Sequence, residues 1–386
     1  MKKVISVFLV LATLVCLCAG CGKSSEKTTI YVYNWGQYIS EGDDGSIDVI
    51  AEFEKKYPNI KVQYSTFDSN ETMYAKLKNG GITVDVVIPS DYMIGRMRQE
   101  GMLQELNYDN IPNAQYIDAS YRGMAFDPED KFSVPYTWGT TGIIYNSKYV
   151  DEADVTGWEL LWNEKYAGKI LMFDNSRDAF GIAEYLLGYS VNSTDSAELQ
   201  ACADKLAEQK PVVQQYVMDQ IFDAMENEEA WIAPYYAGDY LTMVEENPDL
   251  RFFRPEDQGY NIFVDGICIP TCAKEKEAAE TFINFLIDPE ICAKNLDFLG
   301  YSVPETEAKQ YLDAELVANE VAYPVRSSCA TPPPSTSCPR KPPGRWRAFH
   351  DRAERLRHFP NRTQGPDGAR HRGLDFFLLP VYNKRT

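Results

Sequence analysis

The sequence predicts an α/β protein that is divided into two lobes of similar size. Short strand-like segments alternate with amphipathic helices through most of the chain, an order that is typical of a parallel or mixed sheet covered by helices. The alternation occurs twice, on either side of a long extended segment rich in glycine and threonine. A chain of 386 residues, 44% of them apolar, is also long enough for two or three domains with sizeable cores.

The first half contains three strand-like and three helical segments. β-branched and aromatic residues mark the strands, and the last strand ends at Pro89 and Ser90, as a buried parallel strand does. The predicted strands are residues 30–34, 61–65 and 84–88, and the predicted helices are residues 46–57, 71–78 and 92–104. Ligands of such sheets bind at the carboxyl ends of the strands, so the residues that follow these strands are candidates for a binding site.

The second half repeats the pattern after residues 133–146, which we expect to cross between the lobes. The predicted strands are residues 169–173, 212–217, 231–236, 250–253 and 262–270. The predicted helices are residues 176–187, 196–209 and 219–225, a segment from Gly238, and residues 274–287 and 289–299. Trp158 and Trp162 are one helical turn apart, and we interpret both as packing residues.

The chain begins with a segment typical of an exported lipoprotein. Two lysines precede an apolar run over residues 4–20, which is shorter than the roughly 20 residues that a membrane-spanning helix needs. Residues 17–20 resemble a bacterial lipobox, and Cys21 then receives the lipid. We therefore predict a signal peptide over residues 1–21, with Cys21 as the modified residue, and a protein held by acyl chains to a membrane outside the cytoplasm. The alternative is a secreted protein that is cut nearby.

The chain ends with a segment of different composition. From Arg326 onward there are 13 Lys and Arg residues against 4 Asp and Glu residues, together with all three histidines and 9 of the 22 prolines. This segment lacks the apolar periodicity of a packed element. We interpret residues 326–386 as an aberrant tail that resembles translation in a wrong reading frame. The alternative is a basic arm for an anionic surface or nucleic acid.

Residues 1–325 are strongly acidic, and this limits the partners of the protein. They contain 25 basic and 53 acidic residues, a net charge of −28. Because binding to phosphates requires a basic face, we expect no nucleic-acid partner. A cationic ligand is the more natural expectation.

The same residues lack the common catalytic groups. No histidine precedes His350, and there is no G-x-S-x-G, P-loop or G-x-G-x-x-G motif, so we expect neither enzyme activity nor a cofactor. A hydrolase that uses two carboxylates stays open by composition. Cys268 and Cys272 have C-x3-C spacing without a nearby histidine, so no metal site is expected. We interpret them as buried free thiols, with a disulfide as the alternative.

Aromatic residues accompany carboxylates at several predicted strand ends. Tyr236 is followed by Asp239, and Phe263 is followed by Asp265. An alkylammonium ligand needs both kinds of residue, because carboxylates pair with its charges and rings contact its methylene groups.

Several collinear motifs resemble the spermidine/putrescine-binding proteins of bacterial ABC transporters. They are YNWGQY at 33–38, STFDSNETMYAKL at 65–77, DVVIPSDY at 85–92, PYTWG at 135–139, YAGD at 236–239 and GY at 300–301. The resemblance spans residues 29–325 and implies a two-lobed, periplasmic-binding-protein-like (type II) fold with a hinge and an interlobe cleft. It places residues 29–135 and about 263–305 in lobe I, and residues 136–262 and part of 306–325 in lobe II.

The resemblance also implies a set of ligand-binding residues. These are Trp35, Tyr38, Ser90, Tyr92, Asp178, Tyr236, Asp239, Phe263, Asp265 and Tyr301. Asn175 occupies a position where some members of the family have a carboxylate, which favours a diamine over a triamine. Structural alternatives exist, because aromatic residues also fill cores, Asp239 fits a helix N-terminus and Asp265 fits a turn. Trp138 is interpreted as a cleft-floor or hinge residue.

The sequence as a whole therefore predicts an exported, lipid-anchored, monomeric protein that binds putrescine or spermidine and delivers it to an ABC importer. We expect it to have no cofactor and no catalytic activity. The alternatives are a binding protein for another cationic amine or a basic amino acid, an extracellular carboxylate-based hydrolase, and a sensor or adhesin lipoprotein.

Overall fold

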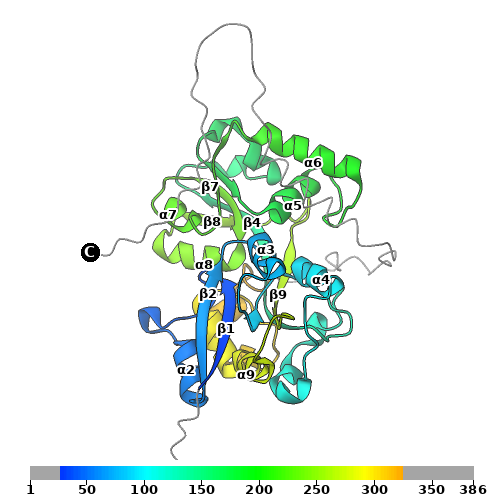
Figure 1. Ribbon diagram of the computed structural model, residues 1–386. Coiled ribbons are helices and arrows are strands. Elements are labelled where there is room, and N and C mark those ends of the chain that lie inside the picture. The colour runs from blue at the N-terminus through cyan, green and yellow to red at the C-terminus, as the bar shows by residue number, and fades with distance from the viewer. Residues whose placement is uncertain (1–26, 325–386) are drawn as a thin grey trace, which may run out of the picture.

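The computed structural model of the protein describes residues 27–324 (Figure 1). The predicted signal peptide with Cys21, and the tail at 326–386, lie outside the described residues, so both stay predictions.

The described residues form a nine-stranded mixed sheet, which confirms the predicted α/β class. The strand order is β2-β1-β3-β9-β4-β7-β5-β6, and β8 pairs with β4. The strands are β1 (Thr28–Trp35), β2 (Ile60–Phe67), β3 (Val86–Val87), β4 (Ser133–Asn146), β5 (Ile170–Phe173), β6 (Val213–Val217), β7 (Ile232–Tyr236), β8 (Leu250–Phe253) and β9 (Ile262–Cys268). β1 runs parallel to β2 and β3, and β5 runs parallel to β6 and β7, whereas β4 and β9 run antiparallel to their neighbours.

Strand β4 connects two parts of this sheet. Its residues 133–140 pair with β9, and its residues 141–146 pair with β7 and β8. The segment expected to cross between the lobes is thus one continuous strand. In Figure 1, β4 and β9 lie between an upper group of helices that includes α5 and α6 and a lower group that includes α2 and α9.

Two large hydrophobic cores lie on either side of this connection. One contains Ile30 of β1 and Phe282 of α9, and the other contains Trp158 and Ile232 of β7, all of them fully buried. Trp162 packs against the second core, so the packing interpretation of both tryptophans is confirmed. The two cores are separate because each parallel group of strands is covered by its own helices.

The segment from residue 306 to residue 324 contacts both parts. Ala308 and Leu312 belong to the first core, while the carbonyl oxygen of Val321 accepts a hydrogen bond of 2.9 Å from Arg254, which follows β8. The boundaries of the two lobes therefore stay a prediction.

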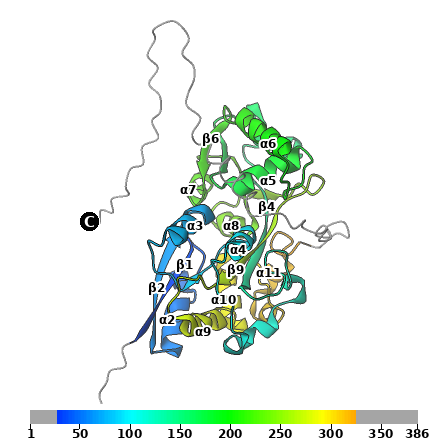
Figure 2. The same cartoon turned by 45° about the vertical axis from the view of Figure 1, so that its right-hand side comes forward.

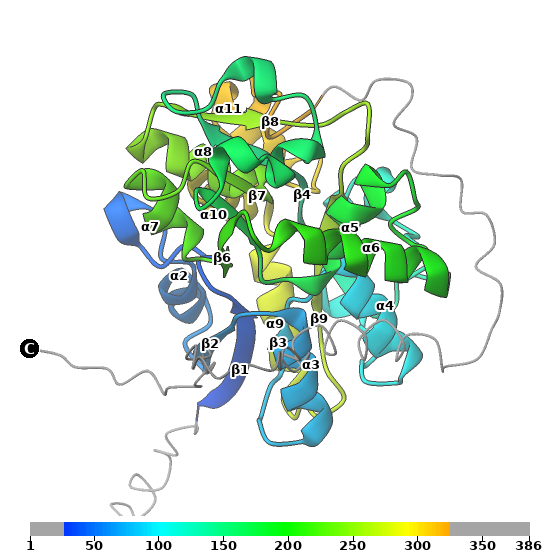
Figure 3. The same cartoon turned by 90° about the horizontal axis from the view of Figure 1, so that it is seen from above.

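Ten α-helices accompany the sheet within residues 27–324. They are α2 (Val49–Lys56), α3 (Asn70–Asn79), α4 (Asp91–Gln99), α5 (Ser176–Leu186), α6 (Ser196–Gln209), α7 (Ile221–Glu226), α8 (Ala237–Glu246), α9 (Lys276–Leu286), α10 (Pro289–Leu299) and α11 (Ala314–Ala318). Helix α2 starts later than predicted because Asp48 caps it through the amide of Ala51. Helices α5 and α6 lie side by side (Figures 2 and 3), and α5 contributes Ala179 and Ile182 to the second core.

The cysteines of the described residues are free, as predicted. Cys202, Cys268 and Cys292 are buried, but Cys272 is exposed, which corrects the expectation that it is buried. It lies in the turn that follows β9, outside the sheet that covers Cys268.

Candidate functional site

A cleft of about 720 Å³, including its open mouth, lies between the two cores. Residues that follow β1, β3, β5, β6 and β7 line it, so the cleft lies at the carboxyl ends of these strands, where a binding site is expected. All ten residues assigned by resemblance line this one cleft: Trp35, Tyr38, Ser90, Tyr92, Asp178, Tyr236, Asp239, Phe263, Asp265 and Tyr301. Their part in binding a ligand stays a prediction.

Helix α5 positions Asp178 through its cap. The side-chain oxygen of Asn175 accepts hydrogen bonds from the backbone amides of Arg177 and Asp178, so the helix begins at the cleft wall. The amide nitrogen of Asn175 donates to Asp178 Oδ2 at 2.9 Å. Asn175 therefore supports the carboxylate of Asp178 by a direct hydrogen bond.

Three tyrosine hydroxyl groups each donate to a different cleft carboxylate. Tyr38 donates to Asp265 Oδ2 at 2.7 Å, Tyr236 to Asp178 Oδ2 at 2.7 Å, and Tyr301 to Asp239 Oδ2 at 2.9 Å. These bonds fix the carboxylates without neutralising them, because a phenol is an uncharged donor. The charge of each carboxylate thus stays available to a ligand.

Burial makes these carboxylates costly to ionise while the cleft holds no cation. Desolvation raises the pKa of Asp265 to about 7, the hydrogen bond from Tyr38 lowers it, and the charge of Asp91 raises it. Desolvation likewise raises the pKa of Asp239 to about 7, against a lowering by Tyr301. The pKa of Asp178 is raised by desolvation to about 6 and is held down by Tyr236, Arg177 and Asn261.

Two buried polar atoms of the cleft, Asp265 Oδ1 and Trp35 Nε1, have no hydrogen-bond partner among the described residues. Asp265 is 4% exposed, and its Oδ1 is buried without a hydrogen bond. A buried acceptor that is left unpaired costs free energy, so this oxygen is suited to receive a donor from a ligand.

Aromatic rings form the walls beside the carboxylates. Tyr38 and Tyr301 meet edge to face with their centroids 5.2 Å apart, and Tyr236 and Phe263 do so at 5.3 Å. Trp138 does not line the cleft, so its interpretation as a cleft-floor residue is wrong, whereas the alternative of a hinge residue stays a prediction. Its ring packs with that of Tyr121, and its indole nitrogen donates to the carbonyl of Val303.

The cleft also contains residues that sequence reasoning missed. Asp91, Asp219 and Asn261 add polar groups, and Arg177 adds a cation whose guanidinium carbon is 5.9 Å from the centroid of the Tyr92 ring. Asp91 and Asp219 directly follow strand regions, and this position was the available signal for them. Nothing in the sequence around Arg177 or Asn261 marks either residue.

Within residues 27–324 no cluster of three or more His, Cys, Asp or Glu side chains is arranged to hold a metal ion. In the same range no helix has the length and apolar character needed to cross a membrane.

A cleft lined from two α/β cores by carboxylates and rings, with one strand running through both cores, defines a two-lobed solute-binding protein. The chain belongs to the family of bacterial extracellular solute-binding proteins, which its residues 48–325 match.

Individual relatives carry more specific names. The chain is 34% identical over 302 residues to the spermidine/putrescine-binding periplasmic protein of Salmonella typhimurium, covering 78% of this chain and 84% of the relative. It is 29% identical to a putrescine-binding periplasmic protein of Escherichia coli (strain K12), with the same coverage of each.

Solved structures of related proteins are also similar to this chain. A spermidine/putrescine ABC transporter protein from Listeria monocytogenes matches with a TM-score of 0.72 and 38% identity, over 78% of this chain and 90% of the other. A lipoprotein of Treponema pallidum matches with a TM-score of 0.66 and 30% identity, over 74% of this chain and 88% of the other. These relatives confirm the predicted fold.

Proposed function

We propose that this chain binds a polyamine, with putrescine and spermidine as the candidate ligands, and delivers it to an ABC importer by closing its two lobes. The observation that carries the proposal is the buried, unpartnered Oδ1 of Asp265 in a cleft walled by aromatic rings. The names of the relatives from Salmonella typhimurium and Escherichia coli support it.

The chemistry of a polyamine fits the two kinds of wall. One ammonium group pairs with Asp265, whose free oxygen accepts from it, and a second pairs with Asp239. The methylene groups between them lie against Trp35 and Phe263, and cation–π contacts contribute about 0.5 to 2 kcal/mol each. A ligand of the wrong length leaves one charge unpaired in the cleft, so the spacing of the carboxylates selects chain length.

Closure of the cleft is proposed to bend the connection formed by β4 and β9. The two cores already approach closely at the mouth, where a Cβ atom on Gly36 would lie 2.6 Å from Oδ2 of Asp219. Closure expels water and strengthens both the charge pairs and the ring contacts. The closed form is then the form that a permease recognises.

The test is a calorimetric titration of the full chain with putrescine, spermidine and spermine at pH 8. The matched control ligand is 1,4-butanediol, which has the length of putrescine but no charge. We expect saturable binding of at least one polyamine and none of the diol. A chain that melts cooperatively and binds none of the amines contradicts the proposal.

We further propose that the protein is an exported, monomeric receptor without catalytic activity or a nucleic-acid partner, anchored by lipid on Cys21 at the outer face of the cytoplasmic membrane. The basis is the leader sequence, together with the periplasmic location in the names of the relatives. Mass spectrometry of the protein from membranes should find a diacylglyceryl group on Cys21, and Cys21→Ser should release the chain from the membrane. An unmodified Cys21, or a Cys21→Ser chain that stays on the membrane, contradicts the anchor.

A further inference from the structure

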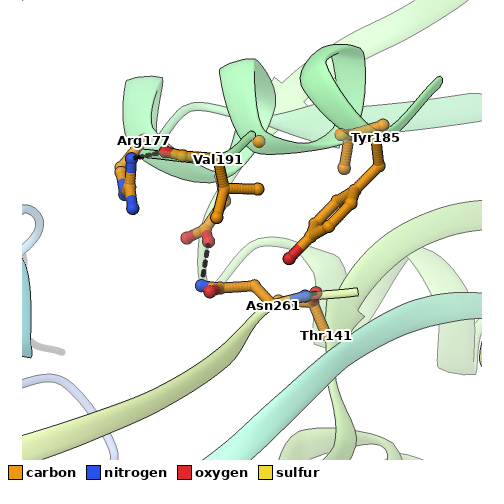
Figure 4. Close-up of a pocket in the computed structure, with 8 residues that line it drawn as sticks. Thr141, Arg177, Tyr185, Val191 and Asn261 are labelled. Carbon is orange, nitrogen blue, oxygen red and sulfur yellow. Dashed lines mark hydrogen bonds between the residues drawn. The ribbon is translucent and has the colours of Figure 1, made fainter. Parts of the chain in front are cut away.

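A second, smaller pocket adjoins the cleft and is lined in part by Asp178. We call it the side pocket. Helix α5 contributes Arg177 and Tyr185 to it, and Thr141 of β4 and Asn261 lie on the opposite side (Figure 4). Arg177, Asp178 and Asn261 line both the side pocket and the cleft, so the two spaces adjoin.

The inner part of the side pocket is apolar and kept free by a glycine. Ile182 and Val191 line it together with Gly181, which is buried inside α5. A Cβ atom on Gly181 would meet a single atom within 4 Å, Cγ1 of Val191 at 3.9 Å. Alanine would therefore fit at this position and would stabilise the helix. Packing does not require glycine here, and the glycine leaves a small free space in the side pocket. The free space suits one group of the size of a water molecule or a methyl group.

The acceptors of Asp178 at the polar rim of the side pocket are already hydrogen-bonded, and a cation lies beside them. Asp178 accepts from Tyr236 and Asn175 at one oxygen and from Asn261 at the other, at 3.3 Å. The positive guanidinium of Arg177 lines the same rim, where it donates to the carbonyl of Val191. An additional ammonium group would meet this cation, whereas a neutral carbonyl group would find the N–H donors of Arg177 and Asn261.

The cleft is therefore asymmetric. At one end Asp265 presents a bare buried oxygen, and at the other end Asp178 has its oxygens occupied and a cation beside it. The end at Asp265 is suited to a positively charged group. The end at Asp178 is suited to a neutral group that carries a small apolar substituent.

We propose that the side pocket receives the neutral acyl cap of a mono-N-acylated diamine, with the free ammonium group of the same ligand at Asp265. This inference rests on the proposed polyamine function and extends its substrate class to singly acetylated diamines. The methyl group of the cap lies against Ile182, Val191 and Gly181, and its carbonyl oxygen accepts from Asn261 or Arg177.

The test compares N-acetylputrescine with putrescine in titrations of the full chain and of Gly181→Ala. The added methyl group occupies the space of the cap, and a mismatch of one methylene or methyl in an apolar pocket changes affinity by about 10- to 200-fold. We expect the wild-type chain to bind both ligands. In Gly181→Ala, affinity for N-acetylputrescine should fall about tenfold or more. Its affinity for putrescine should change by less than about threefold, since putrescine carries no group to place in the side pocket.

The matched control is Gly95→Ala, which makes the same change inside α4. There the new Cβ atom would contact Phe126 at 3.5 Å, an ordinary distance, away from the side pocket. This variant should bind both ligands as the wild-type chain does. Wild-type binding of putrescine without N-acetylputrescine overturns the inference and leaves the polyamine function standing. An equal loss of both ligands in Gly181→Ala also overturns it. A wild-type chain that binds neither ligand overturns the inference as well, and the titrations with spermidine and spermine then decide whether the polyamine function stands.

Discussion

Asp265 combines burial with a carboxylate oxygen that accepts no hydrogen bond from the described residues. We predict that Asp265→Asn weakens putrescine binding by tenfold or more. The ammonium group would then face an uncharged amide in a dry cleft, and removing one partner of a buried charge pair costs about 2 to 5 kcal/mol. Calorimetry at pH 8 measures the change.

The control for this substitution is Asp109→Asn, which makes the same chemical change at an exposed position of the first part of the chain. It should leave the affinity as it is. An Asp265→Asn chain with unchanged affinity would remove Asp265 from the site.

Tyr38 acts on the ligand through Asp265. Its hydroxyl group donates to Asp265 Oδ2 and thereby holds the pKa of that carboxyl below the value that burial alone would give. Tyr38→Phe should raise the pKa of Asp265 further, so that less of the anion is present at neutral pH. We predict a loss of putrescine affinity that is large at pH 6.5 and becomes smaller by pH 8.5. A loss of equal size at every pH would assign Tyr38 a packing role instead.

At the scale of elements, the sequence predicted helix boundaries best where a capping residue or a proline determines them. The predicted helices at 196–209 and 289–299 coincide with α6 and α10, because Asp195 caps the first and Pro289 begins the second. Helix α4 ends at Gln99 and not at residue 104, since Gly101 adopts a φ of +68°. The apolar residues Met102 and Leu103 continue the helical pattern beyond it, so periodicity alone could not locate this end.

Pairing between strands that are far apart in the sequence brings the remaining residues into the site. Asn261 reaches Asp178 because β9 pairs with β4, and Asp219 reaches the mouth because β6 pairs with β5. Neither pairing has a local signal. Seven of the ten assigned residues lie in the motifs that resemble the family, whereas Asp178, Phe263 and Asp265 were assigned from the resemblance outside these motifs. Arg177 was missed because the resemblance implied no role for it.

The first turn of α8 illustrates how closely two elements meet across the cleft. A Cβ atom on Gly238 would lie 2.6 Å from the ring of Tyr301, and the carbonyl of Gly238 lies against Gly300. We predict that Gly238→Ala weakens putrescine binding and costs about 1 to 3 kcal/mol of stability, as overpacking does. Helix propensity alone would make Gly238→Ala stabilising, so a loss of stability would show that the contact with Tyr301 outweighs helix propensity.

Thermal melting and calorimetry of Gly238→Ala measure both effects, with Gly95→Ala as the control for the same change at an ordinary contact distance. A Gly238→Ala chain that is more stable than the wild type, with full affinity, would show that Tyr301 can move away without cost.

At the scale of the whole molecule, buried acids link ligand binding to pH. Desolvation raises the pKa of Asp265 and Asp239 to about 7, and that of Asp178 to about 6, whereas a free Asp titrates near 3.9. Without ligand, the folded chain therefore binds more protons than the unfolded chain between about pH 4 and pH 7. The stability associated with these groups is complete below pH 4 and is lost as the pH rises through 7.

A cation reverses this dependence, because it binds the ionised carboxylates. An alkylammonium group keeps its charge up to about pH 10, and a carboxyl with a pKa of 7 goes from about 3% to about 90% ionised between pH 5.5 and pH 8. We predict that putrescine affinity rises tenfold or more over this interval, while the melting temperature of the ligand-free chain falls by several degrees. Saturating putrescine should reduce that fall, since the anions are then paired. Titrations and melts at matched ionic strength measure both quantities. A ligand-free chain that becomes more stable from pH 5.5 to pH 8, or an affinity that does not change, would mean that the cleft carboxylates are ionised and solvated before any ligand arrives.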